Sequence, residues 1–349
     1  MEYTKPTLPE MDFSKQISYA PHVVIIGAGA SLAACPEGDK NRKKLPLMKD
    51  LIDVVGIRPV LQAHGINGAI LDFESFYDDL VTHNGYPGLQ GQIEERVRTY
   101  FSSLQLPDEV TLYDLLVLSL RGKDLIASFN WDPFLVQAYC RNSGVGELPQ
   151  MVFLHGNVEI GVCKEDRIRG RLGHKCRSCQ EFLEPSRLLF PVKRKDYNAD
   201  EYIRGEWECL RDFLRRAYYV TIVGYSAPKT DIEARSLMLD VWRENPTRKL
   251  AEIDIVDIRL KEELEANWQD FFVRWHYGIQ ESISQAWLFR HVRRSCEALA
   301  MATLQCAPWK SNPFPETKSL PELQEWIRPL LLEEEKQSFS GNPCPPVDG

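Results

Sequence analysis

His22-Val-Val-Ile-Ile-Gly-Ala-Gly-Ala-Ser31 is the stretch that decides the fold. Residues 23–26 form a continuous β-branched run, which is typical of a parallel strand buried on both faces. Gly27 and Gly29 follow at its carboxyl end, where missing Cβ atoms let the backbone turn sharply and approach a pyrophosphate. Residues 30–34 are expected to start a helix whose free N–H groups face that phosphate. The stretch predicts a nucleotide-binding turn. A plain tight turn is the alternative, because the third glycine of G-x-G-x-x-G is absent.

Composition limits the class of protein. The chain has 349 residues, 44% hydrophobic and 26% charged, which is ordinary usage for a globular protein with ample core. Its net charge of −8 gives the whole chain no electrostatic reason to bind nucleic acid or an anionic membrane. No signal-peptide layout or membrane-length apolar run is present, and nine cysteines in such a chain fit reduced thiols. We expect a cytoplasmic protein with no membrane and no strong direct nucleic-acid binding.

Polar or small residues follow four later apolar runs that have the pattern of strands. These runs begin near residues 125, 151, 219 and 253. The residues at their ends are Asn130, Asp132, His155, Gly224, Ser226 and Asp257. Because parallel strands of an open sheet place ligands at their carboxyl ends, we expect these residues to share one site. Local turn, helix-cap or structural roles are the alternative for each polar side chain. Residues 271–277 are predicted as a short sixth strand, and 281–304 as a helix.

The pattern of the whole chain predicts four parts. Residues 1–20 are predicted to be an N-terminal arm, 21–300 a nucleotide-binding catalytic domain, 301–337 a helical extension and 338–349 a disordered tail. Two segments interrupt the catalytic domain. Residues 46–120 have helical spacing and form a predicted helical insertion, and residues 157–190 form a small cysteine-bearing module.

The cysteines of the small module have metal-ligand spacing. Cys176-Arg-Ser-Cys179 is one zinc half-site, and Cys163-Lys-Glu-Asp166 repeats its spacing with a carboxylate in second place. Cys163, Cys176 and Cys179 are the candidate ligands, with Asp166 or His174 as the fourth. The spacing leaves a zinc site and a zinc-free remnant equally open.

The order of these motifs resembles that of the sirtuin-like superfamily of NAD-consuming enzymes, over roughly residues 20–280. The matching anchors are Gly27-Ala-Gly-Ala-Ser31, Phe129-Asn-Trp-Asp132, Leu154-His-Gly156, the cysteine segment and Gly224-Tyr-Ser226. The resemblance implies an α/β fold: a Rossmann-like parallel sheet with a helical insertion and a small degenerate zinc-ribbon-like insertion. It also implies two groups of residues around NAD. The NAD-binding group is Gly27, Ala28, Gly29, Ser31, Gly224 and Ser226, joined by Asp257 as a candidate for a ribose, and the catalytic group is Asn130, His155 and Asp132.

Departures from the protein deacylases favour one branch of that superfamily. Ala33-Ala-Cys-Pro-Glu-Gly38 replaces the Gly-Ile-Pro-Asp-Phe-Arg of deacylases, and the zinc module is degenerate. The pattern looks more like the bacterial sirtuin-like NAD hydrolases of anti-phage defence, which release nicotinamide and ADP-ribose. In that case His155 is the base, Asn130 orients water, and Asp132 holds the nicotinamide end or the local turn.

The same resemblance implies a homo-oligomer, with a ring-shaped motor ATPase (HerA-like) or an Argonaute-type sensor as its partner. Two other functions stay open. One is an NAD-dependent protein deacylase or ADP-ribosyltransferase, and the other is a non-catalytic NAD or ADP-ribose sensor that regulates a partner.

Overall fold

The computed structural model describes residues 19–68, 70, 72–83, 85–192, 197–226 and 231–340, with side chains through Lys336. Residues 1–18 of the predicted N-terminal arm and 341–349 of the predicted tail lie outside these described residues. The proposed division into four parts stays a prediction.

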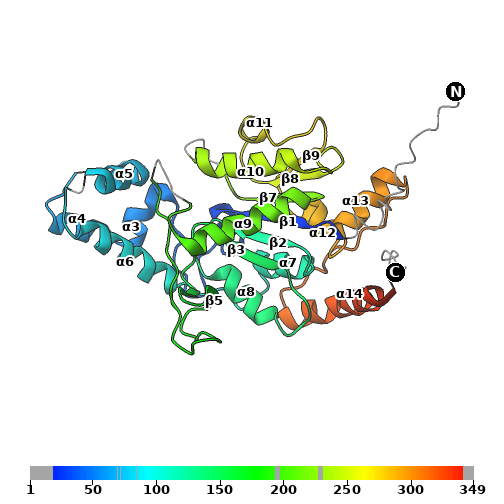
Figure 1. Cartoon of the computed structure of the whole chain (residues 1–349), viewed down its shortest axis with the longest axis horizontal. Helices are drawn as coiled ribbons and strands as arrows, with labels where there is room; N and C mark the ends of the chain where they lie inside the picture. The colour runs from blue at the N-terminus through cyan, green and yellow to red at the C-terminus, as the bar shows by residue number, and fades with distance from the viewer. Residues whose placement is uncertain are drawn as a thin grey trace, which may run out of the picture.

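Six parallel strands form the central sheet (Figure 1). They are β1 (His22–Ile26), β2 (Leu125–Ser128), β3 (Gln150–Phe153), β7 (Tyr219–Val223), β8 (Glu252–Val256) and β9 (Tyr277–Gln280). The order across the sheet is β3-β2-β1-β7-β8-β9, and every neighbouring pair is parallel. The chain therefore winds outward from β1 on one side, and then from β7 on the other. This is the doubly wound order, with its switch point between β1 and β7.

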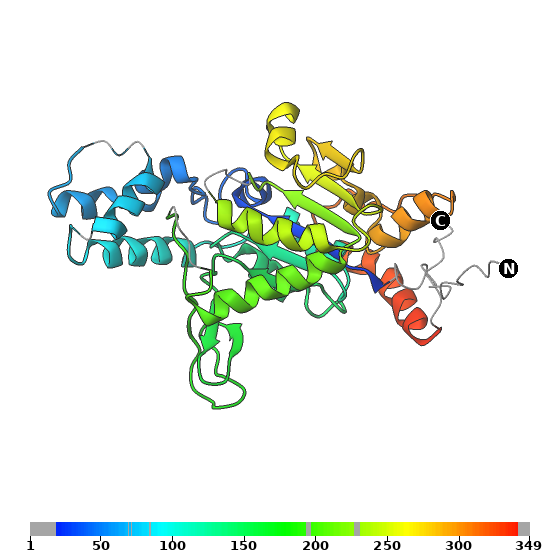
Figure 2. The same ribbon diagram turned by 45° about the horizontal axis from the view of Figure 1, so that its top comes forward.

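Both faces of this sheet are covered by helices, which is why β1 is apolar at every position after His22. Val23 and Ile25 belong to the core that contains α9 (Glu201–Arg216), α10 (Ile232–Glu244) and α11 (Lys261–Trp268). Val24 and Ile26 belong to the opposite core, with α2 (Ala28–Ala34), α7 (Leu112–Ser119) and α8 (Phe134–Asn142). Figure 2 shows these helices on either side of the strands. The predicted Rossmann-like fold class is confirmed.

A run of helices separates β1 from β2, as the spacing predicted. It contains η1 (Met48–Asp50), α3 (Leu51–Val55), α4 (Arg58–Ala63), α5 (Phe73–His83), α6 (Leu89–Ser102) and α7. On α6 the apolar stripe Leu89, Ile93, Val97 and Phe101 is buried, at the four-residue spacing of one helix face. Helices α3 to α6 extend away from the sheet at the left of Figure 1.

The cysteine-bearing module is a separate small sheet. It consists of β4 (Ile160–Cys163), β5 (Ile168–Arg171) and β6 (Glu184–Pro185), which pair antiparallel in the order β5-β4-β6. The C-terminal region adds η2 (Ile283–Gln285), α12 (Trp287–Arg290), α13 (Ser295–Leu304) and α14 (Leu320–Ser340). Among the described residues, no helix has both the length and the apolar character needed to cross a membrane.

Two element predictions from the sequence were wrong. The sixth strand begins at Tyr277 rather than 271, because Phe271 instead packs its ring on Trp268 at the end of α11. The expected helix over 281–304 is broken into η2, α12 and α13, with Arg293 in a left-handed conformation at φ 64° just before α13.

Candidate functional site

A cleft of about 530 Å³ opens at the carboxyl edge of the central sheet, at the switch point. Loops that follow β1, β2, β3, β7 and β8 contribute to its wall. All the residues predicted to bind NAD or to act on it line this cleft: Gly27, Ala28, Gly29, Ser31, Asn130, Asp132, His155, Gly224, Ser226 and Asp257. The structure therefore brings together residues that lie up to 230 positions apart. Their individual roles stay predictions.

The glycine turn after β1 packs against the turn after β7. The N–H of Gly27 donates to Val223 O at 3.1 Å, and that of Gly29 to Gly224 O at 2.9 Å. A Cβ on Gly29 would lie 2.7 Å from Gly224 Cα. Gly224 itself has φ +58°, and its own Cβ would lie 2.4 Å from Ala30 N. These glycines are needed first for contact between two backbone segments.

This packing corrects the expectation that the N–H groups of the turn are free to face a phosphate. Besides those of Gly27 and Gly29, the N–H of Ala30 is also taken, by Gly27 O at 2.9 Å. The turn still lines the cleft, but protein carbonyls occupy three of its donors. The helix also starts at Ala28, two residues before the predicted start.

Asn130 is fixed by a buried network that begins in the helical insertion. Its Nδ2 lies 2.8 Å from Gly27 O, 3.0 Å from Ser31 Oγ and 3.1 Å from the Tyr113 hydroxyl. These donor bonds determine which way the amide faces. Among the described residues, none donates to the side-chain carbonyl oxygen of Asn130.

Asp132 ends the same network. Ser31 Oγ donates to Asp132 Oδ2 at 2.6 Å and lies 2.7 Å from the Tyr113 hydroxyl, and the Phe134 N–H donates to the other carboxylate oxygen. Burial raises the pKa of Asp132 to about 6, against these hydrogen bonds, which lower it. Through these contacts Asp132 joins the glycine turn to the start of α8, and its role toward the nicotinamide end stays a prediction.

His155 follows β3 and is held between aromatic rings. Phe129 meets its ring edge to face at 4.9 Å, and Phe129 in turn stacks on Tyr225 with centroids 4.0 Å apart. The Nε2 atom lies 3.1 Å from the hydroxyl of Tyr197 and 3.8 Å from Oδ2 of Asp231. The imidazole is thus placed in the cleft wall with a hydrogen-bond partner and a carboxylate beside it.

Asp257 has a partner that the sequence analysis did not identify. Arg259 donates to its carboxylate from the main-chain N–H, from Nε and from Nη2, at 3.0, 3.0 and 2.8 Å. Arg259 also lines the cleft, where it is the only lysine or arginine among the described residues. The pair gives this end of the cleft a cation fixed by a carboxylate.

Sequence reasoning missed several other residues of the site. Tyr113 and Tyr197 stand in no motif and reach the site only through long-range packing. Asp231 caps α10, where its side chain accepts from the Ala234 N–H at 3.3 Å, and it was not among the predicted site residues. Residues 45–48 form an apolar part of the cleft wall. Their position at the end of the loop that follows α2 is the one feature of the sequence that could have pointed to them.

Four side chains of the small module converge as metal ligands would. One ligand atom each from Cys163, Asp166, Cys176 and Cys179 lies within 4.8 Å of the others. The Sγ atoms of Cys163 and Cys179 are 3.6 Å apart, and Cys176 Sγ is 3.2 Å from Asp166 Oδ2. A tetrahedral zinc ion with sulfur ligands at ~2.3 Å and an oxygen ligand at ~2.0 Å places its ligand atoms roughly 3.5 to 3.8 Å apart, and the separations here lie within a few tenths of an ångström of that range. The donor set therefore fits zinc, with Asp166 in the fourth place, and His174 is outside this group.

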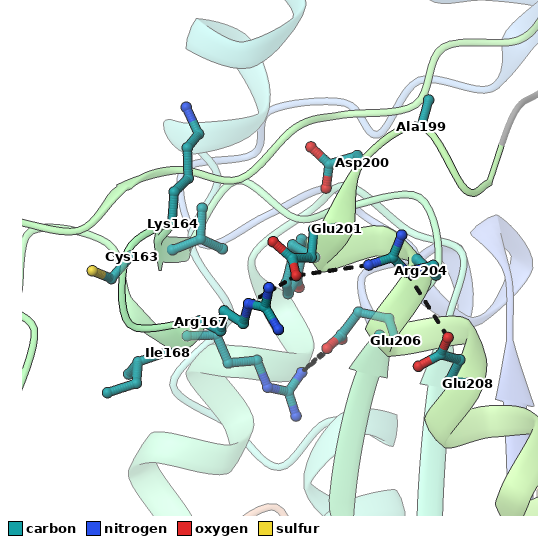
Figure 3. A pocket seen from close by; sticks show the side chains of 14 residues that line it. Cys163, Lys164, Arg167, Ile168, Ala199, Asp200, Glu201, Arg204, Glu206 and Glu208 are labelled. Carbon is teal, nitrogen blue, oxygen red and sulfur yellow. Dashed lines mark hydrogen bonds and ion pairs between the residues drawn. The ribbon is translucent and has the colours of Figure 1, made fainter.

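A second cavity, of about 600 Å³, lies between the small module and the start of α9 (Figure 3). Six of its charged side chains are paired with one another: Arg167 with Glu201 at 2.9 Å, Arg204 with Glu208 at 3.9 Å and Arg169 with Glu206 at 2.6 Å. Glu206 also accepts from the Phe153 N–H, which joins the module to the strand before His155. The cavity is best explained as a junction between the two units.

Comparisons with known proteins give likeness in fold. No protein-family model matches the chain, and no curated protein matches its sequence. It is similar to a solved structure of a Sir2 homologue mutant with ADP-ribose, at 12% identity over 93% of this chain and 98% of that one, with a TM-score of 0.39. It is also similar to a Sir2 homologue–NAD complex, at 13% identity over 93% and 96%, with a TM-score of 0.40. A third is Sir2 bound to an acetylated peptide, at 13% identity over 84% and 98%, with a TM-score of 0.39. At these scores the likeness carries no functional argument, and the chemistry is argued from the cleft itself.

Proposed function

We propose that this chain is an NAD hydrolase, which cleaves the nicotinamide–ribose bond of NAD to give nicotinamide and ADP-ribose. One observation carries the proposal: His155 and Asn130 line the same cleft as the glycine turn at the switch point of a doubly wound sheet. Dinucleotides bind across such crevices. In this arrangement the pyrophosphate lies near residues 27–31, and the nicotinamide half lies over β2 and β3.

The reaction requires the protein mainly to position the substrate, a water molecule and a proton acceptor. Nicotinamide leaves as a neutral molecule with the electron pair of the broken C–N bond, so its departure needs no proton. The ribose carbon gains oxocarbenium character and forms a bond to a water oxygen, and that water must lose a proton. We assign Asn130, through its side-chain carbonyl, to orient the water and His155 to accept the proton.

The opposite half of the cleft suits the adenosine end of NAD. Arg259 supplies the positive charge that a pyrophosphate requires, and Asp257 and Ser226 supply acceptors near a ribose. Stacked Phe129 and Tyr225 form an apolar wall between the halves. The cleft volume of about 530 Å³ is within the range of small-molecule sites, roughly 300 to 1,000 Å³.

The test is to incubate the purified chain with NAD and to follow nicotinamide and ADP-ribose by chromatography. We expect release of free ADP-ribose without any acylated protein, and a loss of about 10² to 10⁴ in rate for His155→Ala. His83→Ala is the matched control, since His83 is exposed at the end of α5 and outside the cleft. Turnover that needs an acylated or acceptor protein would replace the proposal with a deacylase or a transferase. Binding of NAD without nicotinamide release would replace it with a sensor.

We further propose, from the resemblance of the motifs, that the activity depletes NAD in anti-phage defence. An enzyme that destroys NAD must stay inactive until infection. Assembly of the chain with itself or with a partner would be one way to control its activity. The proposal expects a homo-oligomer and an activating partner, either a ring-shaped motor ATPase or an Argonaute-type sensor. Light scattering of the purified chain tests the first point. A monomer with full activity at micromolar concentration would contradict it.

A further inference from the structure

Behind His155 lies a hydrogen-bonded pair that belongs to none of the sequence motifs. Tyr197 precedes α9, Asp231 begins α10, and the Tyr197 hydroxyl lies 3.0 and 3.1 Å from the two carboxylate oxygens of Asp231. The same hydroxyl lies 3.1 Å from His155 Nε2. Tyr197 is 1% exposed and does not line the cleft, whereas Asp231 does. The tyrosine therefore acts on the site only through its neighbours.

The direction of these hydrogen bonds follows from counting protons. A tyrosine hydroxyl has one proton, and an ionised carboxylate can only accept. Tyr197 must therefore donate to Asp231, and its oxygen can then only accept from His155. Since a neutral imidazole carries one N–H and one lone pair, the proton of His155 is on Nε2.

The surroundings keep Tyr197 in the protonated form that this direction requires. Burial, followed by the charge of Asp231, raises the pKa of Tyr197 above its ordinary value. The ring is also fixed in place, because it packs on Trp207 with centroids 4.6 Å apart and lies nearly parallel to the imidazole, at 12°. The hydroxyl consequently has one stable orientation between the carboxylate and the imidazole.

We propose that Tyr197 and Asp231 are positioning residues that hold His155 as the Nε2–H tautomer, which makes Nδ1 the nitrogen that takes the proton from water. This assignment rests on the proposed hydrolase for its catalytic meaning. When Nδ1 is protonated, the Nε2–H···Tyr197 bond persists without rearrangement. Asp231, 3.8 Å from Nε2, then stabilises the imidazolium. In a serine-protease triad a carboxylate fixes the tautomer of the histidine and stabilises its imidazolium form. Here Asp231 has the same effect on His155, with the tyrosine hydroxyl between the two.

The tautomer can be measured without any assay of activity. The full chain is labelled with ¹⁵N-histidine, and the ring-nitrogen signals are recorded by NMR, with His155→Gln used to assign those of His155. We expect a protonated Nε2 and an unprotonated Nδ1 in the neutral form. Protonation on Nδ1 in the wild-type chain would overturn the proposal.

Two conservative variants sharpen the test. In Asp231→Asn the side chain still offers an oxygen to cap α10, but its NH₂ donates to Tyr197 and turns the tyrosine proton toward Nε2. The tautomer should then shift to Nδ1–H, with kcat for NAD reduced by roughly 10²- to 10⁴-fold and KM nearly unchanged. Tyr197→Phe removes the acceptor from Nε2 and should give a mixture of tautomers with a smaller loss in kcat.

Tyr139→Phe, on α8 and away from the cleft, is the control and should leave tautomer and kcat as in the wild type. An unchanged Nε2–H tautomer in both Asp231→Asn and Tyr197→Phe would overturn the proposal. If the chain does not hydrolyse NAD, the proposed function fails while the NMR result still decides the tautomer.

Discussion

Asn130 and His155 are held by two networks of similar design, and the networks differ in where they end. Each contains a buried tyrosine and a carboxylate: Tyr113 with Asp132 behind Asn130, and Tyr197 with Asp231 behind His155. Asp132 is buried and makes no ion pair with the described residues. Asp231 instead lies 3.8 Å from the imidazole and borders the cleft.

This difference separates structural roles from chemical ones. The Asn130 network is a buried set of hydrogen bonds that ties β2 to the glycine turn and to the helical insertion. Its loss should therefore affect folding as well as turnover. The His155 network carries a charge that is useful only when the imidazole is protonated. Its loss should therefore affect turnover far more than folding.

The broadest expected effect is that of Asn130→Ala, which should reduce both turnover and stability. The substitution removes the water-orienting carbonyl and every side-chain bond to Gly27 O, Ser31 and Tyr113. We expect a loss of roughly 10² to 10³ in kcat for NAD and of about 1 to 3 kcal/mol in the free energy of unfolding. Steady-state kinetics and urea unfolding measure the two quantities. His155→Ala should lose activity on a similar scale but keep its unfolding midpoint, and equal destabilisation of both variants would break the comparison.

Gly224→Ala tests the contact between the turns after β1 and β7. Alanine is strained at φ +58°, and its Cβ would lie 2.4 Å from the backbone nitrogen of Ala30, which cannot move aside cheaply. We expect the free energy of unfolding to fall by about 2 to 4 kcal/mol. Gly144→Ala is the control, because no atom lies within 4 Å of the added Cβ there. Similar thermal midpoints for the two variants would show that the turns are not held by this contact.

Asp132 gives the Asn130 network a pH dependence in stability. Its pKa is raised from an ordinary 3.8 to about 6 in the folded chain, so the folded state binds more protons than the unfolded state between these values. The free energy of unfolding should therefore fall by roughly 2 to 3 kcal/mol as pH rises from about 4 through 6, at ~1.4 kcal/mol per pKa unit. Asp132→Asn should flatten this part of the stability profile, whereas Asp240→Asn on α10 should not. A profile unchanged by Asp132→Asn would contradict the assignment.

The sequence predicted the sheet and the edge where the site lies, because strands buried on both faces leave continuous apolar runs and polar residues at their ends. Residues 23–26 and 219–223 show this well. It could not predict Tyr113 or Tyr197, because neither belongs to a motif. They reach their partners through packing of helices and loops that lie 17 and 42 residues away in the chain.

Predictions from local sequence patterns were incomplete or wrong where a tertiary contact decides the structure. Gly27 and Gly29 were expected to let the backbone approach a phosphate, and the backbone of Gly224 and Tyr225 already lies against them; their role toward NAD stays a prediction. Residues 271–277 were predicted as a strand, yet Phe271 completes the packing at the end of α11. For the cysteine module, spacing alone could not choose between Asp166 and His174, since only the folded strands β4 and β5 bring Asp166 among the thiols.

Substitution of Asp166 or His174 should have the smallest effect on turnover in the cleft, and it distinguishes most clearly which of the two is the fourth zinc ligand. Asp166→Ala should lower the zinc content of the purified chain after dialysis against a chelator, as determined by atomic emission, while His174→Ala should retain it. The reason is that Asp166 Oδ2 lies 3.5 Å from Cys163 Sγ and 3.2 Å from Cys176 Sγ, inside the group that fits a tetrahedral ion. Turnover of NAD should change by no more than roughly twofold in either variant, because the module shares no side chain with the two networks of the cleft. Zinc lost in His174→Ala and kept in Asp166→Ala would reverse the assignment. A large loss of turnover in Asp166→Ala would instead mean that the Arg169–Glu206 junction transmits the state of the module to β3 and His155.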